Sequence, residues 1–304
     1  MAYGDLATMI STQHEDLLDF IADVSPDDNP LSTLFGTTSA SNQVHSWTED
    51  YQGRPTSVQS SVEGADATFA DLVNPTRRSN VAQIITQTFK VSGSAKAANV
   101  AGMSDMYAYQ AAKASKIWKN NLEYSLLRAS LTSGASGTAA QMGGIQATVS
   151  SHYTNLNSGT SLSEEHLNAM VLGVASDVGN DQLFDMLVLP LALRQKVSTF
   201  TAGATKNVDA SDKRLTRPVA VYESDFNVIR IFPHKDVVNA VATPGPMVLG
   251  LREDSWKIAY YRKPFRKELP ENGDYSAGEI IGEATLEFRA ERANARSSGF
   301  NTTG

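Results

Sequence analysis

The chain has 304 residues and 41% hydrophobic content, which is enough to bury the core of one large domain or two moderate ones and excludes disorder of the whole chain. It contains no cysteine, which excludes disulfides, thiolate catalysis and thiolate metal sites together and is typical of a reducing compartment. The net charge is −7, and a chain of this acidity without a basic tail is not expected to bind nucleic acid strongly, because counterion release requires clustered lysines and arginines.

The negative charge is concentrated at the N-terminal end. No lysine or arginine precedes Arg54, whereas nine acids do, and removing these nine from the total of 33 leaves 24 acids against 26 bases for the rest of the chain. The segment is interpreted either as a solvated acidic surface or as an acidic arm that docks on a basic neighbour, such as the Arg252–Arg296 region of another copy. The nine acids are Asp5, Glu15, Asp16, Asp19, Asp23, Asp27, Asp28, Glu49 and Asp50.

Residues 1–41 are predicted to form an N-terminal arm. Leu17, Leu18, Ile21 and Val24 recur at helical spacing and predict a short amphipathic helix, which "SPDDNP" then interrupts with two prolines. The apolar run "LSTLFG" follows as a short anchor. The N-terminus lacks the basic start and apolar core of a secretion signal, and no apolar run approaches the roughly 18 residues needed to span a bilayer.

Two strand patterns follow, with a long polar excursion between them. The first strand is expected within Asn42–Tyr51, and the alternation over Arg77–Ala95 predicts a second, longer one. The roughly 25 residues between them bury almost nothing, and a loop of this length is improbable inside a compact domain. The excursion is therefore either disordered or supported from outside the subunit. Its apolar residues are Val58, Val62, Phe69, Leu72 and Val73.

A long helix is predicted over residues 105–131, which contain no glycine or proline. Ser104 is a candidate N-cap with Asp105 in the first turn, and the expected length is roughly 40 Å. Apolar and small residues recur at steps of three and four, whereas polar residues are expected to cover much of the remaining surface. The apolar set is Tyr107, Ala111, Ala114, Trp118, Leu122, Leu126 and Ala129, and the polar set is Lys113, Lys116, Lys119, Asn120 and Glu123.

The second half of the chain alternates helices and strands. Ser163 is predicted to N-cap a helix whose apolar stripe runs to Val178, with Leu162 and Leu167 forming a hydrophobic staple. "FDMLVLP" predicts a buried strand, and "PLALRQKVSTF" predicts a helix with Pro190 near its first turn. Strand patterns follow in "RPVAVYES", "FNVIRIFP", "DVVNAVAT", "MVLGLR" and "WKIAYYR", then a turn at "ENGD" and a closing strand in "EIIGEATLEFRAER". The final segment, "NARSSGFNTTG", is expected to be a polar tail.

No residue pattern indicates an active site. The five histidines are scattered without the HExxH spacing of a zinc site, and neither a phosphate loop nor a GxSxG nucleophile motif is present. Carboxylate pairs such as Glu164/Glu165 are interpreted as exposed caps, and Trp47, Trp118 and Trp256 as structural anchors. We therefore predict no catalytic residue, no cofactor and no metal. The histidines are His14, His45, His152, His166 and His234.

The order of these parts resembles the major capsid protein of tailed bacteriophages, whose shell fold is shared with herpesviruses. The resemblance covers nearly the whole chain and depends on the order and spacing of several short motifs. In chain order they are "DDNPLSTLFG" at 27–36, "SWTED" at 46–50, "EGAD" at 63–66, "TRRSNVAQI" at 76–84, "VSGSA" at 91–95, "NNLEYSLL" at 120–127 and "GGI" at 143–145.

The resemblance implies an α+β fold with four parts. It consists of an N-terminal arm, an extended β-hairpin loop, a peripheral domain with a long spine helix, and an axial domain that clusters around five-fold and six-fold positions. The implied limits are 1–41 for the arm, 42–91 for the extended loop, 92–160 and 266–304 for the peripheral domain with its spine helix at 105–131, and 161–265 for the axial domain.

The resemblance also implies a function. The subunit is expected to self-assemble, as pentamers and hexamers, into the icosahedral head shell that encloses double-stranded DNA, without catalysis and without a membrane. Its location would be the virion, after assembly in the host cytoplasm, with a portal, separate scaffolding and decoration proteins as further partners. Many relatives carry a scaffolding region that is removed at maturation; this sequence is expected to lack it or to be mature already, and no covalent cross-link between subunits is expected.

The extended loop is expected to lie over the adjacent subunit, because a two-stranded ribbon is marginal alone in water. Arg77 and Arg78 would meet acids on that neighbour, and Glu63 would meet a base. Two alternatives stay open, an encapsulin-type compartment shell and an uncharacterised α/β enzyme that uses residues 161–265 as a catalytic domain. The predicted subunit-interface residues are Trp47, Glu49, Glu63, Phe69, Arg77 and Arg78.

Overall fold

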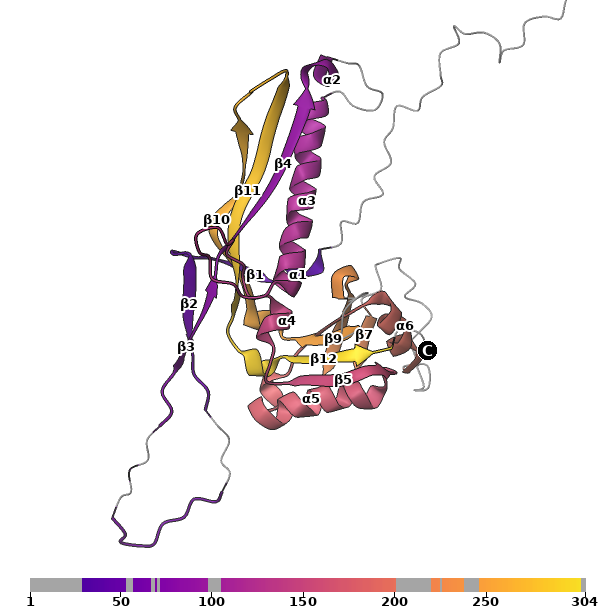
Figure 1. Ribbon diagram of the computed structural model, residues 1–304. Helices are drawn as coiled ribbons and strands as arrows, with labels where there is room; N and C mark the ends of the chain where they lie inside the picture. Colours follow the sequence, from indigo (N-terminus) through magenta and orange to yellow (C-terminus); the bar gives the residue numbers. More distant parts are fainter. Residues whose placement is uncertain are drawn as a thin grey trace, which may run out of the picture.

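The computed structural model describes residues 29–52, 57–66, 69, 72–97, 105–200, 220–224, 226–237 and 246–301. Figure 1 shows an elongated part built around one long helix, a compact part built around a larger sheet, and a two-stranded ribbon whose loop projects away from both. This mixture of helices and sheets agrees with the expected α+β class. The amphipathic helix predicted around Leu17–Val24 lies outside the described residues.

The elongated part is a four-stranded sheet with the long helix α3 (Met106–Arg128) along one face. The strand order is β1 (Gly36–Ser39), β10 (Trp256–Leu269), β11 (Tyr275–Phe288) and β4 (Gln83–Ser92). β1 is parallel to β10, and the other two pairs are antiparallel. The buried residues of α3 recur at three- and four-residue steps, so the helix presents one stripe to the sheet. They include Ala111, Ala114, Trp118, Leu122 and Leu126.

Both ends of α3 differ from the expectation. Ser104 lies outside the described residues, and Asp105 is the N-cap instead, because its carboxylate accepts hydrogen bonds from the backbone N–H groups of Tyr107 and Ala108. The helix ends at Arg128, three residues before the predicted end. The backbone of Gly144 packs against this last turn, where a Cβ atom would lie 2.9 Å from the carbonyl oxygen of Leu126. The glycine therefore allows the returning chain to terminate the helix.

The prediction of one long strand over Arg77–Ala95 is wrong. The chain instead forms two strands, β3 (Thr76–Val81) and β4, which belong to different sheets and are separated at Ala82. β3 pairs with β2 (Val44–Glu49), whereas β4 pairs with β11. The backbone N–H of Ala82 donates to the carbonyl of Gln43, so the ladder of the ribbon ends where the ladder of the larger sheet begins.

The compact part is a six-stranded mixed sheet covered by two helices, α5 (Glu164–Val178) and α6 (Leu191–Phe200). The strand order is β5 (Tyr153–Thr160), β12 (Ala295–Phe300), β9 (Met247–Leu251), β6 (Met186–Leu189), β8 (Val228–Pro233) and β7 (Ala220–Glu223). The short helices of the chain are α1 (Pro30–Leu34), α2 (Gly93–Ala97), α4 (Ile145–Thr148), η2 (Asn180–Gln182), η3 (Lys235–Val237), η4 (Glu253–Ser255) and η5 (Glu291–Ala293).

The sheet of the compact part contributes to two cores. Along β6, Met186 and Val188 pack into the core that surrounds α3, while Leu187 and Leu189 pack into the core beneath α5 and α6. Successive side chains of a strand point to opposite faces, so a fully apolar strand joins two hydrophobic layers. This explains why "MLVL" reads as a continuous apolar run.

Several expectations for the second half are confirmed, and one is wrong. Ser163 caps α5 by accepting from the N–H of His166, and Leu162 and Leu167 are both buried. The predicted polar tail is instead β12, an interior strand between β5 and β9. Small serines allow this burial; the hydroxyl of Ser298 lies 2.9 Å from the hydroxyl of Tyr153. The prediction failed because hydroxyls that are paired inside a sheet look polar in the sequence.

The sheets do not follow the implied domain limits. β5 and β12 lie in the sheet of the compact part, although the limits at 160 and 266 assign both to the peripheral domain. β10 extends beyond residue 265 within the sheet of the elongated part. Most of the predicted strand "DVVNAVAT" lies outside the described residues, and its first residues form η3. No helix among the described residues combines the length and hydropathy that crossing a bilayer requires.

Candidate assembly interface

The ribbon is an antiparallel pair in which Val44 lies opposite Val81 and Glu49 opposite Thr76. Beyond this pair the chain continues as a loop, which Figure 1 shows projecting away from the rest of the molecule. We call residues 50–75 the projecting loop. A ribbon of two strands is only marginally stable by itself, so its position depends on what holds its base.

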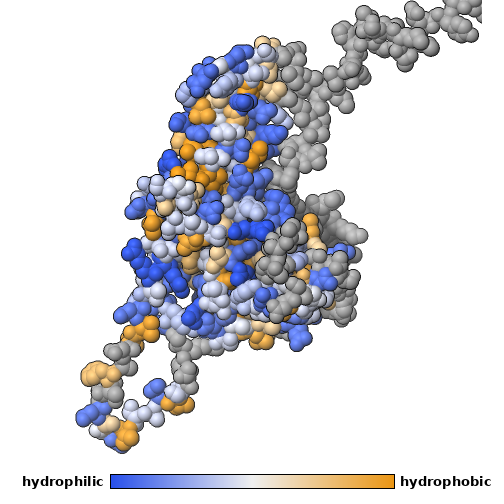
Figure 2. Space-filling model, viewed as in Figure 1, coloured by the Kyte–Doolittle hydropathy of each residue, from blue (hydrophilic) through white to orange (hydrophobic). Residues whose placement is uncertain are grey.

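Apolar side chains of the projecting loop are almost fully exposed. Phe69 is 96% exposed, Val58 93% and Leu72 88%, while Val62 and Val73 are each 80% exposed. Figure 2 shows hydrophobic side chains spaced along this loop, apart from the body of the molecule. Full burial of such a side chain contributes about 1.5–3 kcal/mol relative to exposure. The isolated chain does not gain this free energy, which leaves it available for contact with another surface.

The base of the ribbon packs on its own chain. The ring of Trp47 meets the ring of Phe288 edge-on, with centroids 4.7 Å apart. Nε2 of His45 lies 2.8 Å from a carboxylate oxygen of Glu287, which also accepts from Arg289. Burial alone would raise the pKa of Glu287, but these hydrogen bonds from His45 and Arg289 bring it below its ordinary value.

The charged residues predicted for the interface separate into two groups. Arg78 Nε donates to Glu49 at 3.0 Å, and Arg77 donates to the hydroxyl of Ser46 at 3.0 Å, so all three are paired within the ribbon. Glu63 is exposed far along the projecting loop. The structure thus brings Trp47, Glu49, Arg77 and Arg78 together at the base and leaves Glu63 and Phe69 apart from them. Their contact with another subunit stays a prediction.

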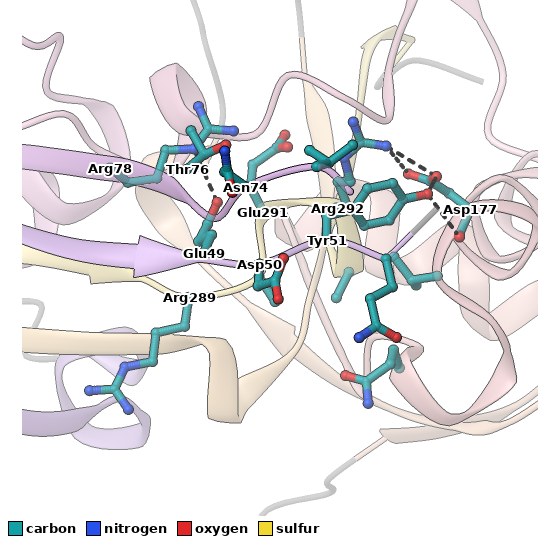
Figure 3. Close-up of a pocket in the computed structure, with 16 residues that line it drawn as sticks. Glu49, Asp50, Tyr51, Asn74, Thr76, Arg78, Asp177, Arg289, Glu291 and Arg292 are labelled. Carbon is teal, nitrogen blue, oxygen red and sulfur yellow. Dashed lines mark hydrogen bonds and ion pairs between the residues drawn. The ribbon is translucent and has the colours of Figure 1, made fainter. Parts of the chain in front are cut away.

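A cluster around Asp177 fastens the start of the projecting loop to α5. The hydroxyl of Tyr51 donates to Asp177 Oδ1 at 2.5 Å, and Arg292 Nη1 donates to both oxygens of the same carboxylate at 3.2 and 3.1 Å. The guanidinium of Arg292 also lies 4.0 Å from the centre of the Tyr51 ring, a cation–π contact. Nε2 of His152 is 3.4 Å from Asp177. We call these four residues the Asp177 clasp (Figure 3).

The Asp177 clasp is held by matched protonation states. The hydrogen bond to the carboxylate raises the pKa of the Tyr51 phenol, which therefore stays protonated as a donor. Partial burial would raise the pKa of Asp177, but the hydrogen bond from Tyr51 and the charge of Arg292 lower it overall. The acceptor thus stays ionised and the donor stays neutral over a wide range of pH.

A pocket of about 350 Å³ lies between the ribbon, α5 and η5 (Figure 3). Acids and bases line it together, and their partners are already assigned: Glu49 bonds Arg78, and Asp177 bonds Arg292. Glu291 accepts from the backbone N–H groups of Ser150 and Ser151. Among the described residues no three histidines or acids are grouped to hold a metal ion. The polar groups of this pocket therefore have structural partners, and the pocket shows no pairing of a nucleophile with a base.

Comparison with known proteins decides which of the expected classes applies. The family described as SU10 major capsid protein matches residues 5–301. The chain belongs to this family. It is therefore a major capsid protein of a tailed phage, a component of the virion shell, and the resemblance seen in its sequence is confirmed. No curated protein sequence matches it.

Solved structures share the fold of this capsid protein at low sequence identity. The capsid of cyanophage A-1(L) is 14% identical with a TM-score of 0.66, and the match covers 95% of this chain and 97% of that one. The capsid of Myoviridae phage XM1 is 10% identical with a TM-score of 0.62, covering 98% and 100%. The encapsulin SrpI of Synechococcus elongatus is 12% identical with a TM-score of 0.60, covering 100% and 98%.

A second cluster, around Glu123, joins three parts of the capsid protein. Glu123 is fully buried in α3, and its carboxylate accepts from the backbone N–H groups of Leu31 at 2.7 Å and Ser32 at 2.8 Å. These groups belong to the N-terminus of α1, which has no side-chain cap of its own, so α3 caps α1 through Glu123. His234 Nδ1 accepts from the N–H of Asp236, so Nε2 carries the proton that it donates to Glu123 at 3.1 Å.

Sequence reasoning missed both clusters. Glu123 was expected on the polar surface of the helix, and the structure corrects this. A signal was present, since Glu123 precedes the buried Leu126 and Leu127 by three and four residues and therefore shares their face. The Asp177 clasp gives no comparable signal, because Tyr51 and Asp177 are separated by 126 positions.

Proposed function

We propose that copies of this capsid protein assemble as pentamers and hexamers into an icosahedral head shell around the double-stranded DNA of the phage. The exposure of the apolar residues on the projecting loop carries this proposal, since Phe69 at 96% and Val58 at 93% find no cover on their own chain. A neighbouring subunit would supply it. Individual contacts can then be weak, because each subunit of a closed lattice is held by several interfaces at once.

The parts of the chain have distinct roles in this proposal. The ribbon with its projecting loop is the extended loop that reaches a neighbour, and the elongated part around α3 is the peripheral domain. The six-stranded sheet with α5 and α6 is the axial domain around the five-fold and six-fold positions. The implied axial limits of 161–265 are then adjusted, because β5 and β12 complete that sheet.

The proposed partners follow from the same function. The shell would incorporate a portal, with separate scaffolding and decoration proteins where these are used, and would assemble in the host cytoplasm. The net charge of −7 suits a wall that faces packed DNA, because an acidic surface does not adhere to phosphate. The subunit would perform no catalysis, and the paired charges in the pocket beneath the ribbon support this.

Removing the projecting loop tests the proposal. Residues 57–73 would be replaced by a short Gly-Ser linker, which leaves β2, β3 and the Glu49–Arg78 pair in place. We expect the variant to fold with an unchanged melting temperature and to form no particles in negative-stain images, whereas the full chain forms closed shells.

A matched control keeps the loop and changes only its polar side chains, with Gln59, Ser60 and Ser61 each replaced by Ala. This control should assemble like the unmodified chain. The proposal is wrong if the unmodified chain stays monomeric under all conditions and lysates contain no particles, or if loop removal leaves shell formation intact.

The encapsulin-type compartment is the second candidate, because the fold likeness to SrpI is nearly as strong as that to the phage capsids. Family membership favours the phage head. The two differ in cargo: particles purified from lysates should contain DNA and a portal in the first case, and a packaged enzyme in the second. Nuclease-protected DNA of genome length would decide for the phage head.

A further inference from the structure

A groove lies between α3 and the β10–β11 hairpin, with a volume of about 420 Å³. Its floor is formed by Trp118, Leu122 and Ile280, which are almost fully buried, and Phe265 stands beside it with 46% of its surface exposed. Trp118 is fixed there because its ring N–H donates to the carbonyl of Ile85. A fixed aromatic floor with an exposed aromatic wall is suited to receive an apolar side chain.

The strand beside this groove has an open, basic edge. β1 pairs with β10 only over Lys257–Tyr260, and from Tyr261 to Glu268 every residue of β10 is exposed. This stretch contains Arg262, Lys263, Arg266 and Lys267, and it also has irregular pairing with β11. Lys263 and Lys267 form no ion pair with any residue that the structure describes. Charge on an edge strand prevents unspecific pairing and favours a partner of opposite sign.

The projecting loop has the complementary composition. Between Arg54 and Arg77 the sequence contains three acids, Glu63, Asp66 and Asp71, and no base. The exposed residues Phe69 and Leu72 lie among these acids. An apolar group flanked by negative charge therefore faces solvent at one place in the molecule, and an apolar groove flanked by positive charge faces solvent at another.

The two surfaces belong to different copies of the chain. Figure 1 shows the projecting loop and the β10–β11 hairpin extending in opposite directions from the middle of the molecule. The loop consists of two legs of about 13 residues, each of which spans at most about 45 Å when extended. A tip that points away from its own groove can reach that of a neighbour instead. The contact is then head-to-tail, and such contacts generate rings.

We infer that the tip of the projecting loop of one copy docks on the α3–β10 groove of a second copy, with Phe69 in the groove and the acids of the loop beside Lys263, Arg266 and Lys267. The inference rests on the proposed shell function and identifies the docking surface within it. The occupant is the loop rather than the acidic segment before residue 29, because the described loop presents the exposed aromatic residue that the groove fits.

Cysteine pairs test this contact without background, since the chain has no cysteine. A chain carrying both Asp66→Cys and Lys263→Cys would be assembled into particles, oxidised and run on a non-reducing gel. We expect a ladder of linked chains, because head-to-tail contacts continue from copy to copy. The control chain carries Asp66→Cys with Lys113→Cys, which places the second thiol on the exposed side of α3. Linkage in the control should be at least tenfold lower.

Charge reversal adds a functional measurement. Lys263→Glu with Lys267→Glu should lower the assembled fraction at least tenfold by sedimentation, while Lys113→Glu changes it less than twofold. Adding Glu63→Lys and Asp66→Lys to the first pair should restore assembly to within threefold.

The outcomes distinguish the inference from the function on which it rests. Absence of particles from the unmodified chain contradicts the shell function itself. Particles that form normally but link Asp66→Cys to Lys263→Cys no better than to Lys113→Cys overturn the inference alone. Linkage of Asp19→Cys to Lys263→Cys in place of the loop pair would mean that the groove receives the acidic N-terminal segment, which also overturns it.

Discussion

The junction around Glu123 and the tip of the projecting loop differ in where their side chains find partners. At the junction, one buried carboxylate receives two backbone N–H groups and a histidine from elements far apart in the sequence. At the tip, Phe69 remains 96% exposed. The first region therefore stabilises the subunit, and the second holds free energy that only assembly releases. This comparison predicts that substitutions separate into those that unfold the chain and those that leave it folded but unassembled.

Removing the carboxylate of Glu123 should have the largest effect on stability. Glu123→Ala leaves the N–H groups of Leu31 and Ser32 and the ring N–H of His234 buried without acceptors. Unsatisfied buried donors cost about 1–3 kcal/mol each, so we expect a loss of about 3–5 kcal/mol. Calorimetry measures the fall in melting temperature, and limited proteolysis should detect release of α1.

A matched control is Glu164→Ala at the exposed start of α5, where the same change removes a carboxylate from a helix surface. Its cost should stay below about 1 kcal/mol. Equal melting temperatures for the two variants would mean that the Glu123 junction does not stabilise the subunit, and the comparison between junction and tip would fail.

A methyl group at Gly282 should have the next largest effect. A Cβ atom there would lie 2.6 Å from the Trp118 ring and 3.1 Å from the backbone of Pro264, so the floor of the groove would have to shift. Overpacking of this kind costs about 1–3 kcal/mol. We expect Gly282→Ala to lower the melting temperature. Gly36→Ala, whose nearest contact would be 3.7 Å away, should not; equal effects would show that the groove floor is adaptable.

The sequence predicted regular elements well because their signals are local. The stripe of Ala114, Trp118 and Leu122 repeats every few residues and identified the spine helix, and the alternation around Trp47 identified the ribbon. The break at Ala82 was missed because it depends on which strand lies beside each half, which the alternation does not encode. β12 was missed because its serines are paired only once the sheet has formed.

The candidate interface was predictable only in part, for the same reason. Exposure of Phe69 follows from a long segment with nothing local to bury it. The pairing of Arg78 with Glu49 was not expected, since both were assigned to a neighbour. The Asp177 clasp depends on residues from the ribbon, α5 and η5, and no local pattern brings these together. Contacts across long sequence separations require the fold itself.

Breaking the Asp177 clasp should have a small effect on stability that depends on pH. Asp177→Asn weakens the ion pair with Arg292, and exposed pairs contribute about 0–1 kcal/mol. The pKa of Asp177 is lowered in the folded state, so its contribution is present above the unfolded pKa and is lost as pH falls through the folded pKa. The difference in melting temperature between the unmodified chain and Asp177→Asn should therefore be largest near pH 7 and vanish in strong acid.

The control for the Asp177 clasp is Asp181→Asn on η2, an exposed acid close by in the sequence. It should show no such convergence. In the alkaline range the pKa of Tyr51 is raised, so the hydrogen bond it donates persists beyond the ordinary phenol pKa and is lost only when the folded phenol ionises. A constant difference from pH 7 to pH 3 would contradict the assignment of the effect to Asp177.

Substitutions at the tip should have the smallest effect on the subunit. Replacing Val58, Val62 and Leu72 by Ser changes side chains that are 80% exposed or more, so stability should stay within about 0.5 kcal/mol. Leu126→Ser in the core of α3 removes a similar apolar group that is fully buried, and should cost about 2–5 kcal/mol. Assembly should respond in the opposite way per unit of stability lost, since the triple variant folds normally yet forms far fewer particles in light scattering. If its melting temperature instead fell as far as that of Leu126→Ser, the loop would be buried against its own chain, and its apolar side chains would have no free energy left to contribute to a neighbour.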